Sequence, residues 1–196
     1  MATELLWALV LYAFVTSITP GPNNLMLMAS GANFGFRRTI PHMLGIGIGF
    51  TVMVFLVGVG LMGVFDTVPY SYDVLKIVSV IYLVWLAWKV ANSGEAKNEG
   101  GAATPISFVQ AALFQWVNPK AWSMALTAIT LYAPDRSFES VVVVATVFGA
   151  VNLPCVSSWT VLGQQMRLFL TNSARLRAFN YMMAALLIAT LVPVLL

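Results

Sequence analysis

Long apolar stretches alternate with short polar connections along this chain of 196 residues. Six stretches approach the length of a membrane-crossing helix: residues 5–29, 40–65, 74–90, 106–133, 140–162 and 179–196. A helix needs about 20 predominantly apolar residues to cross the hydrocarbon core of a membrane. The pattern therefore predicts an all-α membrane protein with six transmembrane helices, which form a single transmembrane domain over residues 1–196.

The first and fourth predicted helices contain residues that interrupt an α-helix. One break is residues 19–24 (Thr-Pro-Gly-Pro-Asn-Asn), and the other is residues 118–120 (Asn-Pro-Lys), so that Pro119 follows Pro20 by 99 positions. Proline removes a backbone N–H and glycine loosens the chain, so each break releases backbone groups inside the membrane. Such groups must face protein, water or a ligand. Paired breaks of this kind are typical of transport sites.

The composition excludes most other classes of protein. Hydrophobic residues make up 60% of the chain and charged residues 9%, and the mean hydropathy is +0.86. In soluble domains about a quarter of residues are charged. The net charge of +3 comes mainly from short loops, which favours a lipid bilayer over nucleic acid as partner. Cys155 is the single cysteine, and phosphate-loop and common hydrolase motifs are absent, so we expect no enzyme activity, no cofactor and no metal.

The loop charges indicate an orientation. Seven Lys and Arg residues follow the first, third and fifth stretches, whereas two, Lys76 and Arg136, lie on the opposite side. Loops rich in Lys and Arg stay in the cytoplasm. Both termini are therefore predicted on the periplasmic or extracellular side of a bacterial inner (plasma) membrane.

The polar connection of residues 92–104 is predicted to be a cytoplasmic linker between two halves, about 1–91 and 105–196. Each half holds three predicted helices, so the second half enters the membrane in reverse, which predicts two inverted three-helix repeats. At 1.5 Å per residue, the first break lies about 20 Å from the outer start of its helix and the second about 18 Å from the inner start of its own. The breaks then bracket the midplane of a layer about 30 Å thick, and we expect them to line one cavity.

The candidate substrate-binding residues come from both breaks and from polar positions nearby: Pro20, Gly21, Pro22, Asn23, Asn24, Gln115, Asn118, Pro119, Lys120 and Asn152. Free amides at the start of the helix after the first break suit a carboxylate. Each candidate also has a structural alternative. Asn23 and Asn24 could cap the broken helix, and Lys120 could pair with carbonyl groups released by Pro119. The amides of the fourth and fifth predicted helices could instead join neighbouring helices by hydrogen bonds. No acidic residue lies deep in a predicted span, which favours a net-neutral solute over a dibasic one.

Several of these motifs resemble one family of membrane proteins. Residues 19–23 (Thr-Pro-Gly-Pro-Asn), residues 35–38 (Gly-Phe-Arg-Arg), Gly45 and Gly49 are together similar to the lysine exporter and homoserine/threonine exporter superfamily, the LysE-type translocators. The similarity continues through residues 82–89 (Tyr-Leu-Val-Trp-Leu-Ala-Trp-Lys), 105–108 (Pro-Ile-Ser-Phe) and 117–120 (Val-Asn-Pro-Lys). The pattern is most similar to the branch that exports cysteine and O-acetylserine.

The resemblance implies a secondary transporter that exports small neutral amino acids or related metabolites from the cytoplasm, driven by the proton motive force. Two other hypotheses stay open from the sequence: a passive channel for small solutes, and a membrane protein that transports nothing. The small size of the chain is also compatible with a homodimer.

Overall fold

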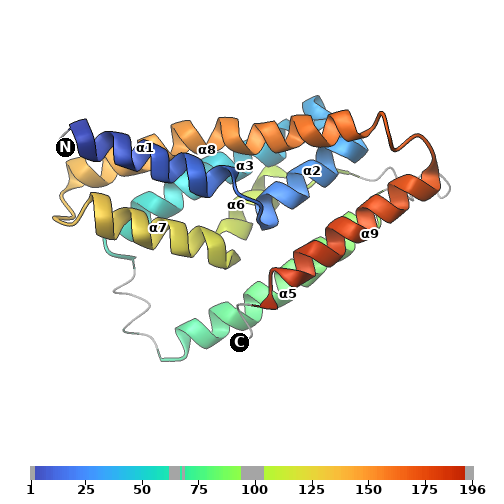
Figure 1. Cartoon of the computed structure of the whole chain (residues 1–196). Coiled ribbons are helices and arrows are strands. Elements are labelled where there is room, and N and C mark those ends of the chain that lie inside the picture. The colour runs from blue at the N-terminus through green and yellow to red at the C-terminus, as the bar shows by residue number, and fades with distance from the viewer. Residues whose placement is uncertain (1–2, 62–66, 68, 94–103, 193–196) are drawn as a thin grey trace.

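The structure is a computed structural model that describes residues 3–61, 67, 69–93 and 104–192. The helices with bounds in these ranges are α1 (Thr3–Ile18), α2 (Pro22–Phe34), α3 (Phe36–Gly58), α5 (Ser71–Ala91), α6 (Phe108–Val117), α7 (Pro119–Tyr132), α8 (Phe138–Met166) and α9 (Ser173–Ala189). Figure 1 shows them as a single elongated bundle in which α5 and α9 lie side by side and oblique to the other helices. The prediction of an all-α protein is confirmed for the described residues.

The first predicted span consists of two helices with a break between them. α1 ends at Ile18 and α2 begins at Pro22, and the two helices are bent by 56°. Proline suits the first position of a helix because the N–H that it lacks would have no partner there and its φ is already helical. Gly21, the N-cap of α2, has an extended backbone and supplies no side-chain cap. The predicted break at residues 19–24 is confirmed.

The fourth predicted span is also divided in two. A capping box of Ser107 and Gln110 starts α6, which ends at Val117. Asn118 is both the C-cap of α6 and the N-cap of α7, and its Oδ1 accepts a hydrogen bond from the Lys120 backbone N–H at 3.2 Å. The second break is therefore confirmed, with its asparagine serving as the cap on which the next helix starts.

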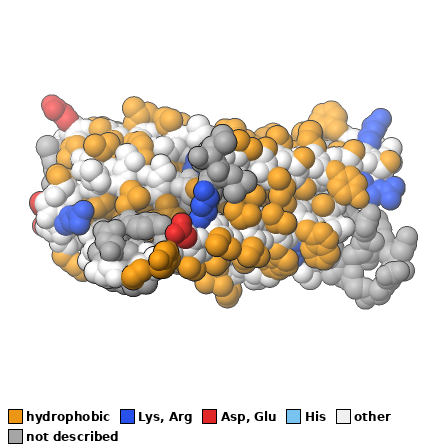
Figure 2. Space-filling model, turned by 90° about the horizontal axis from the view of Figure 1, so that it is seen from below, with side chains coloured by type: hydrophobic (Ala, Val, Ile, Leu, Met, Phe, Trp, Pro, Cys, Tyr) orange, Lys and Arg blue, Asp and Glu red, His pale blue; other side chains and the backbone are white. Residues whose placement is uncertain are grey.

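Length and composition support several membrane crossings. α3, α8 and the part of α5 from Asp73 to Ala91 are each long and apolar enough to cross a membrane, which makes three spans, or four if the bent pair of α1 and α2 is counted as one broken span. α6 has 10 residues and α9 has 17, so neither reaches that length alone. The count of six spans and the inverted repeat therefore stay predictions. Large apolar side chains cover much of the surface, as expected where lipid is the solvent (Figure 2).

Some helix ends differ from the predicted ones because polar residues extend or cap a helix. α8 continues through Pro154 to Met166, beyond the predicted end at residue 162. α9 begins at Ser173 rather than 179, because the side chain of Asn172 accepts a hydrogen bond from the Arg175 backbone N–H and caps it. The predicted end of the second stretch at residue 65, most of the linker (94–103) and the last residues (193–196) lie outside the described residues.

The apolar core forms two clusters. One contains buried residues of α2, α5, α6, α9 and the first half of α3, and the other contains those of α1, α7 and the second half of α3. Along α8 the change from one cluster to the other falls between Phe148 and Val156, and along α3 between Ile46 and Phe50. Both helix breaks fall at the same change, so the polar residues of the breaks lie at the boundary between the clusters.

Candidate functional site

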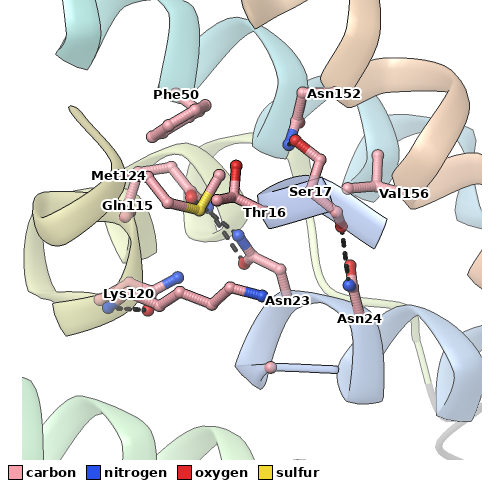
Figure 3. A pocket seen from close by; sticks show the side chains of 13 residues that line it. Thr16, Ser17, Asn23, Asn24, Phe50, Gln115, Lys120, Met124, Asn152 and Val156 are labelled. Carbon is pink, nitrogen blue, oxygen red and sulfur yellow. Dashed lines mark hydrogen bonds between the residues drawn. The ribbon is translucent and has the colours of Figure 1, made fainter. Parts of the chain in front are cut away.

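Residues from both breaks line one hollow at the boundary between the two apolar clusters. Its accessible volume is about 20 Å³, roughly the space that one water molecule needs, so a larger solute enters only if the helices around the hollow move apart. Its lining comes from the end of α1, the start of α2, α3, the α6–α7 junction and α8: Thr16, Ser17, Gly21, Asn23, Asn24, Phe50, Gln115, Asn118, Lys120, Ala121, Met124, Asn152 and Val156. Figure 3 shows their side chains converging from helices that are far apart in the sequence.

Side chains satisfy the carbonyl groups that the break leaves free at the end of α1. Asn24 donates its amide to the carbonyl oxygens of Ser17 at 2.9 Å and of Thr19 at 2.7 Å. The indole N–H of Trp159 on α8 donates to the carbonyl of Ile18 at 3.0 Å. A helix leaves its last carbonyls without partners inside the helix, and in an apolar layer each must find a donor. Asn24 thus caps the broken helix, which was one of the two roles that the sequence suggested, the other being contact with substrate.

Lys120 joins the second break to the first. Its ammonium donates to the carbonyl oxygen of Thr19 at 2.8 Å, to the Thr19 hydroxyl at 3.0 Å and to the carbonyl oxygen of Pro20 at 3.4 Å. The sequence suggested that the lysine could pair with carbonyls released by its own neighbour Pro119, whereas these partners belong to the other break. A cation at the end of α1 also stabilises the negative end of that helix.

Gly21 makes room for the Lys120 side chain. A methyl group on Gly21 would lie 2.8 Å from Cδ of Lys120 and 3.2 Å from its Nζ, closer than ordinary van der Waals contact. This close approach, rather than the backbone, favours glycine here, because its φ of −176° is one that any residue adopts. The sequence predicted that Gly21 makes the chain flexible, and the structure shows in addition that Gly21 leaves space for the side chain of Lys120.

A pair of amides forms a second link between the two halves. Asn23 donates to Oε1 of Gln115 at 2.8 Å, and Gln115 donates to Oδ1 of Asn23 at 3.2 Å. Gln115 also donates to the carbonyl of Ala111 one turn earlier in α6, at 2.8 Å. The amide of each side chain is thus both donor and acceptor, and the start of α2 is fixed against the end of α6.

Asn152 reaches the hollow from α8. It is 5% exposed, and its amide nitrogen donates to the hydroxyl of Ser17 at 3.1 Å. Its oxygen Oδ1 has no hydrogen-bond partner among the residues that the structure describes. Buried polar atoms are nearly always paired, so an unpaired one at the wall of a hollow indicates a position where a ligand group can bind.

Seven of the ten predicted site residues line the hollow. Pro20, Pro22 and Pro119 do not, and their part is to interrupt the helices, although the carbonyl of Pro20 contacts Lys120. The clustering confirms that the two breaks line one cavity, and contact of these residues with a substrate stays a prediction. The sequence reading missed Thr16 and Ser17, which lie in the last turn before a break, where side chains can replace missing backbone hydrogen bonds.

The lining of the hollow contains one positively charged side chain and several neutral hydrogen-bonding groups. Lys120 is the charged side chain of its lining, and that lining contains no Asp or Glu. A site of this kind provides charge pairing for an anion and neutral acceptors and donors for the remainder of a solute. The fold and the site together define a multi-pass membrane protein in which two broken helices enclose a polar hollow, the arrangement of a membrane translocator.

The sequence comparisons identify the family. The chain belongs to the LysE type translocator family, whose model matches residues 14–195. This family consists of translocators and is not a class of enzymes. The family resemblance noted in the motifs is thereby confirmed.

Curated relatives agree with this assignment. The chain is 35% identical over 134 residues to the "Cysteine/O-acetylserine efflux protein" of Escherichia coli strain K12, an alignment that covers 67% of each chain. The proteins of that name from Shigella sonnei and Shigella flexneri match with the same identity and coverage. No solved structure matches this chain.

Proposed function

We propose that this protein is a secondary transporter that exports small neutral amino acids or related metabolites of the cysteine and O-acetylserine type from the cytoplasm. The names of the curated relatives support the cargo class. The observation that carries the proposal is the hollow where both helix breaks meet, with Lys120 among neutral amides and hydroxyls. A dibasic amino acid lacks an anionic partner for its side chain in this lining, whereas a zwitterion brings one carboxylate to one lysine.

Lys120 is the proposed anchor for the carboxylate of the cargo. Its ammonium now donates to three neutral oxygens of Thr19 and Pro20. An ionised acceptor forms stronger hydrogen bonds with an ammonium than a neutral carbonyl does. The cargo carboxylate therefore competes with the oxygens of the first break, and the Thr19 carbonyl keeps its hydrogen bond from Asn24 when the lysine leaves.

This exchange gives the cargo a means to change the conformation of the carrier. A ligand shifts a conformational equilibrium only if it interacts differently with the two states. The link between Lys120 and the first break joins the two halves of the chain, and the cargo replaces it. Movement of one half against the other about the hollow is the alternating access that inverted repeats provide.

In the proposed orientation, the end that carries the loops α2–α3 and α8–α9 faces the cytoplasm. Arg37, Arg38, Arg167, Arg175 and Arg177 lie in or beside these loops. Figure 2 shows Lys and Arg side chains gathered at this end of the molecule, on the right of the view. Both termini then lie outside a bacterial inner membrane. Energy coupling to protons and assembly as a homodimer are further parts of the proposal that need their own measurements.

The proposal is tested with purified protein in liposomes loaded with labelled cysteine under reducing conditions. Efflux against a cysteine gradient when a pH gradient is imposed supports a secondary transporter, whereas flux that only follows the solute gradient supports the passive channel. If none of a broad panel of amino acids moves, the protein transports none of them and the proposal is wrong.

The role of the lysine is tested by Lys120→Met, which keeps the length of the side chain without its charge. Loss of a hydrogen bond to a charged group, about 1.5–3 kcal/mol, lowers the apparent affinity for cysteine about 10- to 100-fold. Lys76→Met is the matched control, because Lys76 is an exposed lysine at the start of α5 and outside the hollow. Equal efflux by the two variants would contradict the role given to Lys120.

A further inference from the structure

Asn152 lines the hollow and carries a buried, unpaired acceptor. Four buried side-chain nitrogen and oxygen atoms have no hydrogen-bond partner in the described part of the chain, and they belong to His42, Asn152 and Thr160. Only Asn152 among these residues lines the hollow. The other end of its amide is fixed by the hydrogen bond to the Ser17 hydroxyl, so the orphaned oxygen is held in place.

The neighbouring amides of the hollow already have partners. Asn23 and Gln115 are paired with each other, and the amide nitrogen of Asn24 donates to two carbonyls of the first break. Asn118 Oδ1 accepts from the backbone of α7. These hydrogen bonds shape the site, whereas Oδ1 of Asn152 is buried without a donor among the described residues and can accept from a bound solute at no cost to an existing bond.

The acceptor and the cation come from opposite sides of the hollow. In Figure 3, Lys120 extends from α7 on one side and Asn152 from α8 on the other, with Asn23 and Gln115 between them. Both groups also reach the same short segment of chain, since Lys120 contacts Thr19 and Asn152 contacts Ser17. A donor group for a carboxylate and an acceptor for an ammonium thus belong to the lining of one hollow.

We propose that Oδ1 of Asn152 accepts a hydrogen bond from the ammonium group of the cargo while Lys120 holds its carboxylate. Asn152 is then the residue that selects α-amino acids over carboxylates that lack an amino group. This inference rests on the proposed transport of amino acids. A neutral acceptor suits a zwitterion because it binds the ammonium without adding a charge, so the lysine remains paired with the single carboxylate.

The test is competition against export of labelled cysteine by the full-length protein in liposomes. 3-Mercaptopropanoate lacks the ammonium group of cysteine, and cysteamine lacks its carboxylate. For the wild type we expect unlabelled cysteine to compete about 10- to 100-fold better than 3-mercaptopropanoate. Asn152→Leu, which is similar in size, should remove most of this advantage by weakening cysteine while 3-mercaptopropanoate competes as before.

Two further variants keep the test decisive. Asn152→Asp retains acceptor oxygens and adds a charge, so it should keep the preference for cysteine over 3-mercaptopropanoate and improve competition by cysteamine. Thr160→Val removes another buried hydroxyl of α8 that has no partner and does not line the hollow, and it should leave all preferences unchanged. If Asn152→Leu does not fold, the Asp variant and cysteamine decide the question.

The outcomes separate this inference from the proposed function. If the wild type exports no amino acid, both are wrong. If the wild type exports cysteine, two results for Asn152→Leu would overturn the role of Asn152 and leave the proposed function standing. In the first, the variant weakens competition by cysteine and by 3-mercaptopropanoate equally. In the second, it loses the preference for cysteine over cysteamine instead of the preference over 3-mercaptopropanoate. The second of these results would mean that the amide nitrogen, rather than the oxygen, faces the cargo.

Discussion

Two glycines of α3 offer a matched pair for testing how closely the helices that form the hollow must pack. Gly49 and Gly47 lie two residues apart on the same helix and gain the same methyl group when replaced by alanine. At Gly49 this methyl would lie 2.7 Å from Cα and 3.0 Å from Cβ of Ala112, on the backbone of α6. At Gly47 it would lie 3.3 Å from Cδ1 of Leu153, the end of a side chain that can rotate.

The magnitude follows from these distances. Ordinary van der Waals contact begins at 3.4 Å, so Gly49→Ala requires α3 and α6 to separate by about 0.7 Å, the difference between 3.4 and 2.7 Å. Overpacking of this kind costs about 1–3 kcal/mol. Both variants gain up to about 1 kcal/mol of helix propensity. This gain cancels in the comparison, and Gly49→Ala should be less stable than Gly47→Ala by about 1–3 kcal/mol.

The assay is thermal unfolding of the two variants in the same detergent, read by the fraction that remains monodisperse. For a chain of this size, the expected difference corresponds to a melting temperature lower by about 2–12 °C for Gly49→Ala. Displacement of α6 also moves Gln115, which lies one turn after Ala112 and lines the hollow, so cysteine efflux should fall in this variant and not in Gly47→Ala. Equal melting temperatures and equal efflux would refute the reasoning.

Three further predictions follow from individual contacts. Gly21→Ala places a methyl group 2.8 Å from Cδ of Lys120 without straining the backbone, so it should lower the affinity for cysteine with little change in melting temperature. Gly47→Ala is again the control, and an unchanged affinity in Gly21→Ala would contradict the steric role of Gly21. His42 is fully buried, and neither of its ring nitrogens has a hydrogen-bond partner among the described residues. His42→Leu should therefore leave the melting temperature unchanged or raise it. A fall of more than about 1 kcal/mol in the free energy of unfolding would instead show that the ring is hydrogen-bonded. Reporters fused to the C-terminus should be active outside the cytoplasm, and cytoplasmic activity would reject the predicted orientation.

The class of the protein and the places where its helices break could be predicted from the amino-acid sequence alone. The length of the apolar stretches reports membrane crossings directly, because the thickness of the bilayer fixes how many residues a helix needs. Proline fixes its own φ and lacks a donor whatever surrounds it, so the breaks at residues 19–24 and 118–120 follow from local chemistry. The motifs around them were also sufficient to indicate the family, which the comparisons confirmed.

The ends of the helices could not be predicted as well from hydropathy. α9 begins at Ser173 because Asn172 caps it, and α8 passes through Pro154 to Met166, where the chain is no longer uniformly apolar. Hydropathy indicates which part of a helix is apolar, whereas capping residues and hydrogen bonds determine where the helix begins and ends. The predicted spans therefore differed from the helices by several residues at these ends.

Which polar groups pair with one another, and which one stays without a partner, depends on how the helices pack. The sequence places Lys120 beside Pro119, yet its partners are carbonyl oxygens about 100 residues away, on Thr19 and Pro20. The sequence makes both Asn24 and Asn152 candidates for substrate contact, yet Asn24 caps α1 while the oxygen of Asn152, a residue that lines the hollow, has no donor among the described residues. Hydrogen bonds depend on distance and direction in space, and side chains on different helices acquire these only when the helices pack.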